Sequence, residues 1–368
     1  MMMYIYELED WPNFTWDYET LVNKLAEVRL KQGRLLGRME AVGFSIRDEA
    51  VLHTLTVEIV KSNEIEGEKL DTEQVRSSIA RRLGMDVAGI PVTNRNIDGV
   101  VEMMLDATQN YDKPLTKERL FGWQAALFPT GYSGMYKVNA GAWRTDSNGP
   151  MQVVSGRIGR FKVHFEAPPA VRIDKEMETF FEWFNRNEAM DMILKAAIAH
   201  LWFVTIHPFE DGNGRIARAI TDMALAKSEN SPYRFYSMSA QIKIEDKMYY
   251  EQLEFTQKDT LDITEWLVWF LDCLNRVFDN VESTLDAVLS KTHFWQKWSN
   301  QSLNERQVKM LNKIMDGFEG KLTTTKWAKI MKCSQDTALR DIGDLVKRGI
   351  LVKTIAGGRS TSYEIKTE

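Results

Sequence analysis

The sequence contains little cysteine, the residue whose disulfides hold small secreted proteins together. Its 368 residues include only two cysteines, Cys273 and Cys333, and their spacing matches no zinc motif. Two cysteines cannot build a disulfide framework, so the sequence excludes the disulfide-rich secreted class. A reducing compartment, the cytoplasm, is therefore the expected location.

The sequence also lacks a long hydrophobic run. The most apolar stretch, residues 193–206, contains Lys195 and His200 and is shorter than the ~20 residues that span a bilayer. The first residues of the chain include Glu7, Glu9 and Asp10 and no apolar core, which is unlike a signal peptide. We therefore expect no association with membranes.

Neither sign of charge dominates the chain, but the charge is unevenly distributed. The net charge is −5, with 44% hydrophobic and 27% charged residues, which is typical of a soluble protein of roughly two or three domains. From Lys291 to the end there are 15 Lys and Arg against 8 Asp and Glu, so this part is basic and the remainder is acidic. Such asymmetry favours a separate C-terminal module that meets an acidic partner.

Apolar residues at helical spacing predict a mainly α fold. Helices are expected over residues 17–41, 48–66, 96–108, 116–127, 174–187, 192–206 and 262–289. Between residues 131 and 170 Gly, Pro and Asn are frequent, and two short β-like runs, 151–154 and 162–165, flank a turn-rich connection. They predict a small β-hairpin within an otherwise helical chain.

One compact stretch, HPFEDGNGRIAR at residues 207–218, concentrates groups that can do chemistry. The apolar run before it predicts a buried helix. Pro208 disfavours the α conformation of His207, so we expect the helix to end there and His207 to lie on extended backbone. Phe209 is expected to pin the loop to the core.

The second half of this stretch suits an anion. The Gly-Asn-Gly run at 212–214 tolerates left-handed backbone angles and can turn several N–H groups toward one point. A second helix is expected from near Arg215, and its N-terminus is a site for phosphate. Arg215 and Arg218 would share one face of that helix, and Asp211 adds a carboxylate. Together with the imidazole of His207, these groups suit a metal-bound nucleotide polyphosphate.

The same stretch resembles the signature of a known family. It fits the Fic pattern H-x-F-x-(D/E)-G-N-G-R-x-x-R at every fixed position. Fic proteins are AMP transferases that modify protein hydroxyl groups, so the resemblance implies a Fic-type helical catalytic core over 111–285 that uses ATP and Mg²⁺. It implies that His207 is the general base and that Asp211 is the metal ligand. The contacts with ATP that it implies in this loop come from Asp211, Gly212, Asn213, Gly214, Arg215 and Arg218.

A second short motif lies in the N-terminal helical region, residues 1–110. Gly67 follows the helix expected over 48–66 as a C-cap would, which leaves Glu66 at the negative end of the helix dipole. A carboxylate there is either exposed or paired with a cation. Residues 62–67, with Ser62, Glu66 and Gly67, also resemble the Fic inhibitory motif (S/T)-x-x-x-E-(G/N). The resemblance implies that Glu66 pairs with Arg218 and inhibits the enzyme, and we expect the pair to be bidentate.

Two further assignments follow from the resemblance. The hairpin at 151–165 resembles the Fic flap, which holds a target protein by strand addition, and Val153 and Val154 would border the bound ligands. The alternative is a plain surface hairpin. By position Tyr249, Tyr250 and Gln257 resemble the segment that flanks adenine and ribose, and the alternative for them is core packing.

The basic C-terminal part, residues 290–368, is organised differently. Helices are predicted over 304–315, 323–331 and 334–348, followed by strands over 350–353 and 362–365. This order resembles a winged helix, whose partner could be DNA or a protein. Asp336, Asp341 and Asp344 on the last helix argue against tight contact with phosphates.

The resemblance thus implies a protein adenylyltransferase. It would transfer AMP from ATP to a Ser, Thr or Tyr hydroxyl of a target protein, release pyrophosphate, and be inhibited by Glu66. Two alternatives stay open at this point. Glu66 could orient water for the removal of AMP from a protein, or the Fic core could sense nucleotide for a DNA-binding regulator. A homodimer is also compatible with the sequence.

Overall fold

The computed structural model describes residues 3–41, 44–85, 95–147, 149–157, 160–186, 189–298, 301–315, 320–354 and 361–366. The chain divides into two compact units, residues 1–280 and 281–368. Helices dominate both units, and the described strands pair in small antiparallel sheets. The predicted mainly α fold with a small hairpin is therefore confirmed. Within the described ranges, every helix falls short of the length or the apolar character needed to cross a bilayer.

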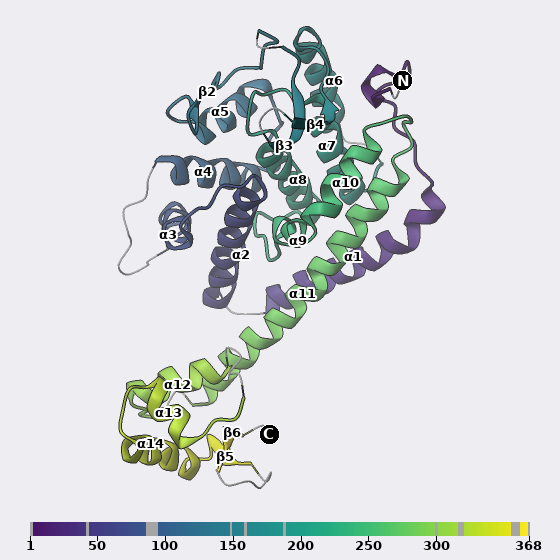
Figure 1. The fold of residues 1–368 in the computed structure, drawn as a ribbon. Helices are drawn as coiled ribbons and strands as arrows, with labels where there is room; N and C mark the ends of the chain where they lie inside the picture. The colour runs from purple at the N-terminus through teal and green to yellow at the C-terminus, as the bar shows by residue number, and fades with distance from the viewer. Residues whose placement is uncertain are drawn as a thin grey trace. The chain divides into compact units, whose positions relative to one another are not determined.

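Helices make up most of the first unit (Figure 1). Two short 3-10 turns are η1 (Ile5–Glu7) and η2 (Ala170–Arg172). The α-helices are α1 (Tyr18–Ala41), α2 (Phe44–Ile65), α3 (Thr72–Arg82), α4 (Arg95–Gln109), α5 (Lys117–Leu127), α6 (Ile173–Asn185), α7 (Met192–Ile206), α8 (Asn213–Glu229), α9 (Met238–Ile244), α10 (Asp246–Thr256) and α11 (Thr264–Lys297), whose residues after 280 belong to the second unit. The predicted helices are confirmed with shifted ends, whereas α3, α9 and α10 were not predicted.

Helix α7 forms the centre of the first unit. Its sequence has no polar face, and every side chain from Ile193 to Ile206 is buried. A helix that is apolar all round must be covered on all sides, and α6 and α8 pack directly against it (Figure 1). At its N-terminus the carboxylate of Asp191 accepts a hydrogen bond from the N–H of Ile193. The predicted bounds, 192–206, are confirmed.

Helices α2, α3 and α4 form a layer beside α8. Both α2 and α4 pack against α8, and α3 packs against α2 and α4. The sequence gives little sign of α3, because Val75 and Ile79 are its only large apolar side chains. On another side of the unit α11 lies beside α1 (Figure 1), where Lys24 pairs with Asp272 at 2.6 Å.

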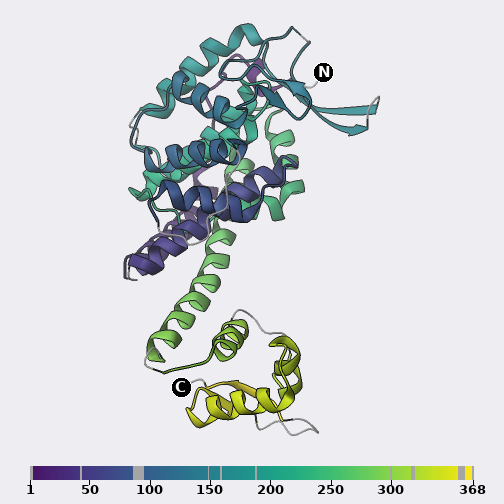
Figure 2. The ribbon, with the colours of Figure 1, turned by 90° about the vertical axis from the view of Figure 1, so that its left-hand side faces the viewer.

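Two hairpins extend from the helices. Strand β1 (Tyr132–Ser133) pairs with β2 (Tyr136–Lys137), and β3 (Gln152–Arg157) pairs with β4 (Arg160–Glu166). The longer hairpin is the one predicted at 151–165. A β-bulge separates Val153 from Val154, and the far end reaches beyond the helices in Figure 2. Residues 158 and 159 of its connection lie outside the described residues. The β1–β2 hairpin was not predicted, because strands this short show no alternating pattern.

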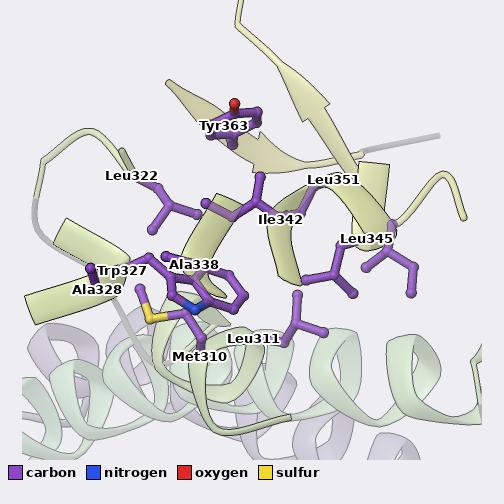
Figure 3. Close-up of a cluster of buried hydrophobic side chains, with 11 residues drawn as sticks. Met310, Leu311, Leu322, Trp327, Ala328, Ala338, Ile342, Leu345, Leu351 and Tyr363 are labelled. Carbon is purple, nitrogen blue, oxygen red and sulfur yellow. The ribbon is translucent and has the colours of Figure 1, made fainter. Parts of the chain in front are cut away.

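The second unit has its own core. It contains α12 (Glu305–Met315), α13 (Thr324–Ile330), α14 (Gln335–Lys347), β5 (Leu351–Lys353) and β6 (Tyr363–Ile365). This is the predicted order of three helices followed by a hairpin. Figure 3 shows Trp327 of α13, Ile342 of α14 and Tyr363 of β6 in one buried cluster.

Two acidic side chains of α14 form ion pairs with arginines of the same unit. Asp341 accepts a hydrogen bond from Nε of Arg306 at 2.9 Å, and Asp344 accepts one from Nε of Arg348 at 2.8 Å. Their charges are neutralised locally, so they are weaker evidence against an anionic partner than the sequence indicated. Asp336 is exposed.

Candidate active site

The loop between α7 and α8 turns sharply at His207. This residue has φ 51° and ψ 57°, a left-handed conformation that is uncommon for residues other than glycine. The expected extended backbone at His207 is therefore wrong. Pro208 does keep residue 207 out of the right-handed helical region. The N–H of His207 nevertheless closes the last turn of α7 on the carbonyl of Phe203, at 3.0 Å, as in a left-handed helix cap.

Arg144 holds this turn in place. Its backbone N–H donates to the carbonyl of Pro208 at 2.9 Å. Its guanidinium donates to the carbonyls of His207, at 2.7 Å, and Pro168, at 2.5 Å, and is paired with Asp146. A strained backbone conformation persists where the surrounding structure fixes it, and the buried Arg144 does so here. Sequence analysis missed Arg144, because it lies 63 residues before His207.

The environment of His207 keeps its ring neutral. Nδ1 lies 3.3 Å from the carbonyl oxygen of Val204. In the neutral tautomer that donates from Nδ1 to this carbonyl, Nε2 carries a lone pair. Burial lowers the pKa of His207 to about 4, with the Val204 carbonyl opposing the shift and Arg144 adding to it. The neutral form therefore dominates at physiological pH, as a general base requires.

Two side chains shape the rest of the loop. Phe209 is fully buried against Phe203 and Trp143, as expected for a residue that pins the loop. Asn213 accepts the N–H of Phe209 at 3.0 Å and donates to its carbonyl at 2.8 Å. The side-chain amide of Asn213 is thus engaged within the loop, which leaves its backbone N–H for an anion.

Helix α8 begins at Asn213, two residues before its expected start. Gly212 precedes it with φ 90°, and a Cβ atom there would come within 3.0 Å of Leu127, so this position requires glycine. The first N–H groups of any α-helix have no partner within the helix and carry partial positive charge. The start of α8 is therefore suited to an anion, as predicted for residues 212–214.

Arg215 and Arg218 add positive charge at this helix end. Their residues are only 3% and 2% exposed. Among the described residues, the buried side-chain nitrogens that have no hydrogen-bond partner include Nε of Arg215 and Nη1 of Arg218. Buried donors without partners are uncommon in folded proteins. Unpaired guanidinium donors beside a helix N-terminus fit a polyphosphate ligand.

Asp211 is the side chain of the loop that could hold a divalent cation. Its Oδ1 accepts the N–H of Gly212 at 2.6 Å, and its Oδ2 accepts the hydroxyl of Ser133 at 2.5 Å. The side chain is 42% exposed. In the described parts of the chain, no cluster of three or more His, Cys, Asp or Glu could hold a metal by itself. A cation here would need phosphate oxygens as well as Asp211, which is how Mg²⁺ is commonly bound.

The C-terminus of α2 ends in a tight backbone turn. The N–H of Gly67, with φ 79°, bonds to the carbonyl of Glu64 at 3.1 Å, and the N–H of Glu68 bonds to the carbonyl of Asn63 at 2.9 Å. These two bonds form a Schellman motif and confirm Gly67 as the predicted C-cap glycine. The motif leaves Glu66 directly after Ile65, the last residue of α2.

Glu66 meets Arg218 of α8. Nη2 of Arg218 donates to Oε1 of Glu66 at 2.8 Å, so the predicted ion pair is present. The expectation that it is bidentate is wrong. Nε of Arg218 donates to the hydroxyl of Ser62 at 2.8 Å, and Nη2 also donates to the Ser62 carbonyl at 2.8 Å. Because Ser62 takes these donors, Glu66 receives one bond from Arg218.

A second carboxylate of the same turn was not predicted. Oε2 of Glu68 accepts a hydrogen bond from Nη1 of Arg215 at 2.8 Å. The end of α2 therefore places one carboxylate against each arginine of the loop. The only sign of this in the sequence is an acidic residue two positions after Glu66, which cannot be told from an exposed one.

The other residues expected near the nucleotide lie farther into the structure or at its surface. Tyr249 is 2% exposed, and its hydroxyl is 2.8 Å from Nε2 of His200 in the core. Gln257 is also buried and donates to Thr205 at 3.1 Å. Tyr250 is 44% exposed. Val153 is half-buried and Val154 is exposed on the hairpin.

Comparison with known proteins agrees with this geometry. Residues 114–225, which include the whole His207 to Arg218 loop, match the Fic/DOC family. The chain carries a Fic domain. Residues 4–85, ahead of the Fic domain, match a domain of unknown function (DUF4172).

Two curated relatives of this chain are named as adenylyltransferases. The protein adenylyltransferase Fic of Nematostella vectensis is 31% identical over 147 residues, which are 39% of this chain and 31% of that protein. A probable protein adenylyltransferase of Aquifex aeolicus is 32% identical over 68 residues, which are 18% of this chain and 21% of that protein. The chain thus spans less than a third of the length of these relatives.

Solved structures share the fold. A Fic family protein from Desulfovibrio desulfuricans has a TM-score of 0.56 and 19% identity, covering 97% of this chain and 98% of its own. A Fic domain containing signaling protein from Bacteroides thetaiotaomicron has a TM-score of 0.50 and 17% identity, covering 71% of this chain and 95% of its own. These similarities confirm the Fic-type helical core.

Proposed function

We propose that this Fic domain transfers AMP from ATP to a Ser, Thr or Tyr hydroxyl of a target protein and releases pyrophosphate. The observation that carries the proposal is the neutral His207 in the loop that opens α8, whose Arg215 and Arg218 are buried and suited to a polyphosphate. The names of the curated relatives, both adenylyltransferases, support the same chemistry.

The proposed reaction is an attack on the α-phosphate assisted by a base. Nε2 of His207 takes the proton of the target hydroxyl as its oxygen attacks the α-phosphorus, and the bond from that phosphorus to the bridging oxygen breaks. Arg215, Arg218 and the first N–H groups of α8 stabilise the negative charge of the leaving pyrophosphate. Asp211 would hold Mg²⁺, which when bound supplies further positive charge to the phosphates.

The end of α2 is proposed to inhibit this reaction. While Arg218 is bonded to Glu66 and Arg215 to Glu68, the two guanidinium groups that the terminal phosphates need are already neutralised. A γ-phosphate would also lie close to the negative charge of Glu66. ATP is therefore expected to bind in an unproductive pose until this end of α2 moves away.

The target is expected to bind along the β3–β4 hairpin. In the described residues this sheet has two strands, so an extended segment could add to an outer edge. Val154 is paired with Val163, and both are exposed on one apolar face. On the other face His164 bonds through Nδ1 to Glu254 of α10 at 2.5 Å, which ties the hairpin to the helices. The apolar face is left for the target.

The proposal can be tested with ATP labelled either in the α-phosphate or in the γ-phosphate. Wild-type protein and the Glu66→Gly variant would be incubated with cell lysate, and labelled proteins identified by mass spectrometry. Transfer of the α-label alone is expected, with more label for Glu66→Gly and none after adding His207→Ala. Transfer of the γ-label would indicate a kinase. Loss of AMP from already modified proteins, without any transfer, would favour the alternative of AMP removal.

A further inference from the structure

The β1–β2 hairpin meets the active-site loop although its tip is open to solvent. Met135 and Tyr136 are 92% and 81% exposed. The N–H of Asn139, just after the hairpin, donates to Oε2 of Glu210 at 2.8 Å. The hydroxyl of Ser133 donates to Oδ2 of Asp211 at 2.5 Å. This exposed hairpin is thus connected to the loop by hydrogen bonds to two of its carboxylates.

The hairpin holds Ser133 in a defined place. Ser133 pairs with Tyr136 across a two-residue connection, and Gly134, with φ 56°, supplies the positive φ that such a connection needs at its first residue. The N–H of Val138 bonds to the carbonyl of Gly131 at 2.9 Å, and Val138 is 5% exposed. These contacts hold β1 in place, so the position of Ser133 beside Asp211 is well defined.

The contact with Ser133 fixes the plane of the Asp211 carboxylate. Oδ1 accepts the N–H of Gly212 at 2.6 Å and lies 3.7 Å from Nη2 of Arg215. Oδ2 accepts the Ser133 hydroxyl. Each carboxylate oxygen has about two lone-pair sites, so the bonded oxygens keep acceptor capacity for a cation. Without the hydroxyl, rotation about the Cβ–Cγ bond would let the carboxylate turn away.

We propose that Ser133 is a positioning residue that orients the Asp211 carboxylate for the divalent cation bound with the nucleotide. The inference rests on the proposed function only in requiring a metal–nucleotide complex at this loop. Loss of a hydrogen-bonding partner of a metal ligand typically lowers metal affinity about 10–100-fold. An effect of that size is expected on the affinity for Mg²⁺, and none on the affinity for nucleotide without metal.

The test compares Ser133→Thr with Ser133→Val in the full chain carrying Glu66→Gly. Threonine and valine have nearly the same shape, so the pair isolates the hydroxyl. The probe is an ATP analogue with a methylene group between the α- and β-phosphates, which cannot donate AMP. Its binding would be measured calorimetrically as Mg²⁺ is titrated, and again in EDTA. Met135→Ala, on the exposed tip of the same hairpin, is the control.

The half-saturating Mg²⁺ concentration should be at least about tenfold higher for Ser133→Val than for Ser133→Thr, with equal binding of the analogue in EDTA. Ser133→Thr and Met135→Ala should match the parent. Equal Mg²⁺ dependence for Thr and Val would overturn the inference, and so would an equal loss of binding with and without Mg²⁺. Thermal unfolding checks each variant, and Ser133→Ala replaces Ser133→Val if valine prevents folding.

This titration is independent of catalysis. A protein that transfers no AMP can still show the difference between threonine and valine, in which case only the proposed function fails. A protein that transfers AMP but gives the same Mg²⁺ dependence for both variants contradicts only the role of Ser133.

Discussion

Gly214 lies directly against the carboxylate of Glu66. A Cβ atom at residue 214 would come within 2.2 Å of Oε1 of Glu66, so only glycine admits the carboxylate to the first turn of α8. That turn is where a phosphate is expected to bind. The carboxylate and a terminal phosphate therefore compete for one place and for the guanidinium of Arg218.

Replacing Glu66 with glycine should increase AMP transfer. The freed Arg218 could bind the γ-phosphate, and hydrogen bonds to charged groups contribute about 1.5–3 kcal/mol, so an increase of about ten- to a hundredfold in kcat/KM for ATP is expected. The measurement is incorporation of labelled AMP. Glu64→Gln is a matched control, because Glu64 lies at the same helix end but pairs with Lys61. Adding Arg218→Ala should abolish the gain, and equal incorporation by wild type and Glu66→Gly would contradict inhibition.

Glu68→Gln should strengthen ATP binding to a smaller extent. The change frees Arg215, but the side chain of Glu68 is 45% exposed against 31% for Glu66. Exposed ion pairs typically contribute about 0.2–1 kcal/mol, so the affinity for ATP should rise at most about fivefold. Titration with a non-transferable ATP analogue, in the Glu66→Gly background, gives the value. An unchanged Kd would mean that Arg215 does not contact the bound nucleotide.

The rate of transfer should persist to unusually low pH for a histidine base. The base must be neutral, and burial lowers the pKa of His207 to about 4. As pH falls, kcat/KM should therefore decrease near pH 4 instead of near ~6.5, the value for free imidazole. The rate of AMP transfer by the Glu66→Gly variant would be measured at each pH. Circular dichroism at the same pH values would confirm that the protein stays folded. Half-maximal activity near ~6.5 would contradict the desolvated ring.

His207→Ala should separate catalysis from binding. Loss of a positioned base typically lowers the rate about 10²–10⁴-fold. The affinity for ATP should be retained, since the imidazole does not hold the phosphates in the proposed reaction. Single-turnover transfer and calorimetric titration on the same sample measure both quantities. Wild-type transfer by His207→Ala, with label verified on the target, would refute the assignment.

Arg144→Lys should impair catalysis and leave nucleotide binding unchanged. Lysine keeps the positive charge beside Asp146, but it has no planar fork with which to bond the carbonyls of His207 and Pro168 together. Displacement of a reacting group by about 1 Å can lower a rate about 10²-fold. Arg172→Lys is a suitable control, because Arg172 pairs with Glu176 instead. A normal rate for Arg144→Lys would show that His207 is positioned without it.

Features that depend on neighbours along the chain, or that a family motif marks, could be predicted from the sequence. The bounds of α7 follow from an apolar run that Asp191 begins and Pro208 ends. The pairing of Glu66 with Arg218 was also predictable, because the dipole of α2 and the family motif both call for a cation beside that carboxylate.

Contacts between distant segments that no family motif marks could not be predicted. Arg144 reaches the carbonyl of His207 across 63 residues, and Ser133 reaches Asp211 across 78. The sequence around Arg144 or Ser133 contains nothing that distinguishes it from any other arginine or serine. The conformation of His207 was mispredicted for the same reason. Its proline neighbour excludes the right-handed helix but does not choose between extended and left-handed backbone, and the hydrogen bonds from Arg144 do.

The turn that ends α2 has a consequence for how the proposed inhibition would be lifted. Glu66 and Glu68 flank Gly67, and the backbone bonds of Gly67 and Glu68 to the preceding helical turn hold both carboxylates in place. Those bonds fix the backbone from which both carboxylates reach the arginines, so unwinding this one turn releases both. A partner that pulls on the end of α2 would thus uncover two positive charges in a single step. A population of these molecules should then contain closed sites and open sites, with few that are half released.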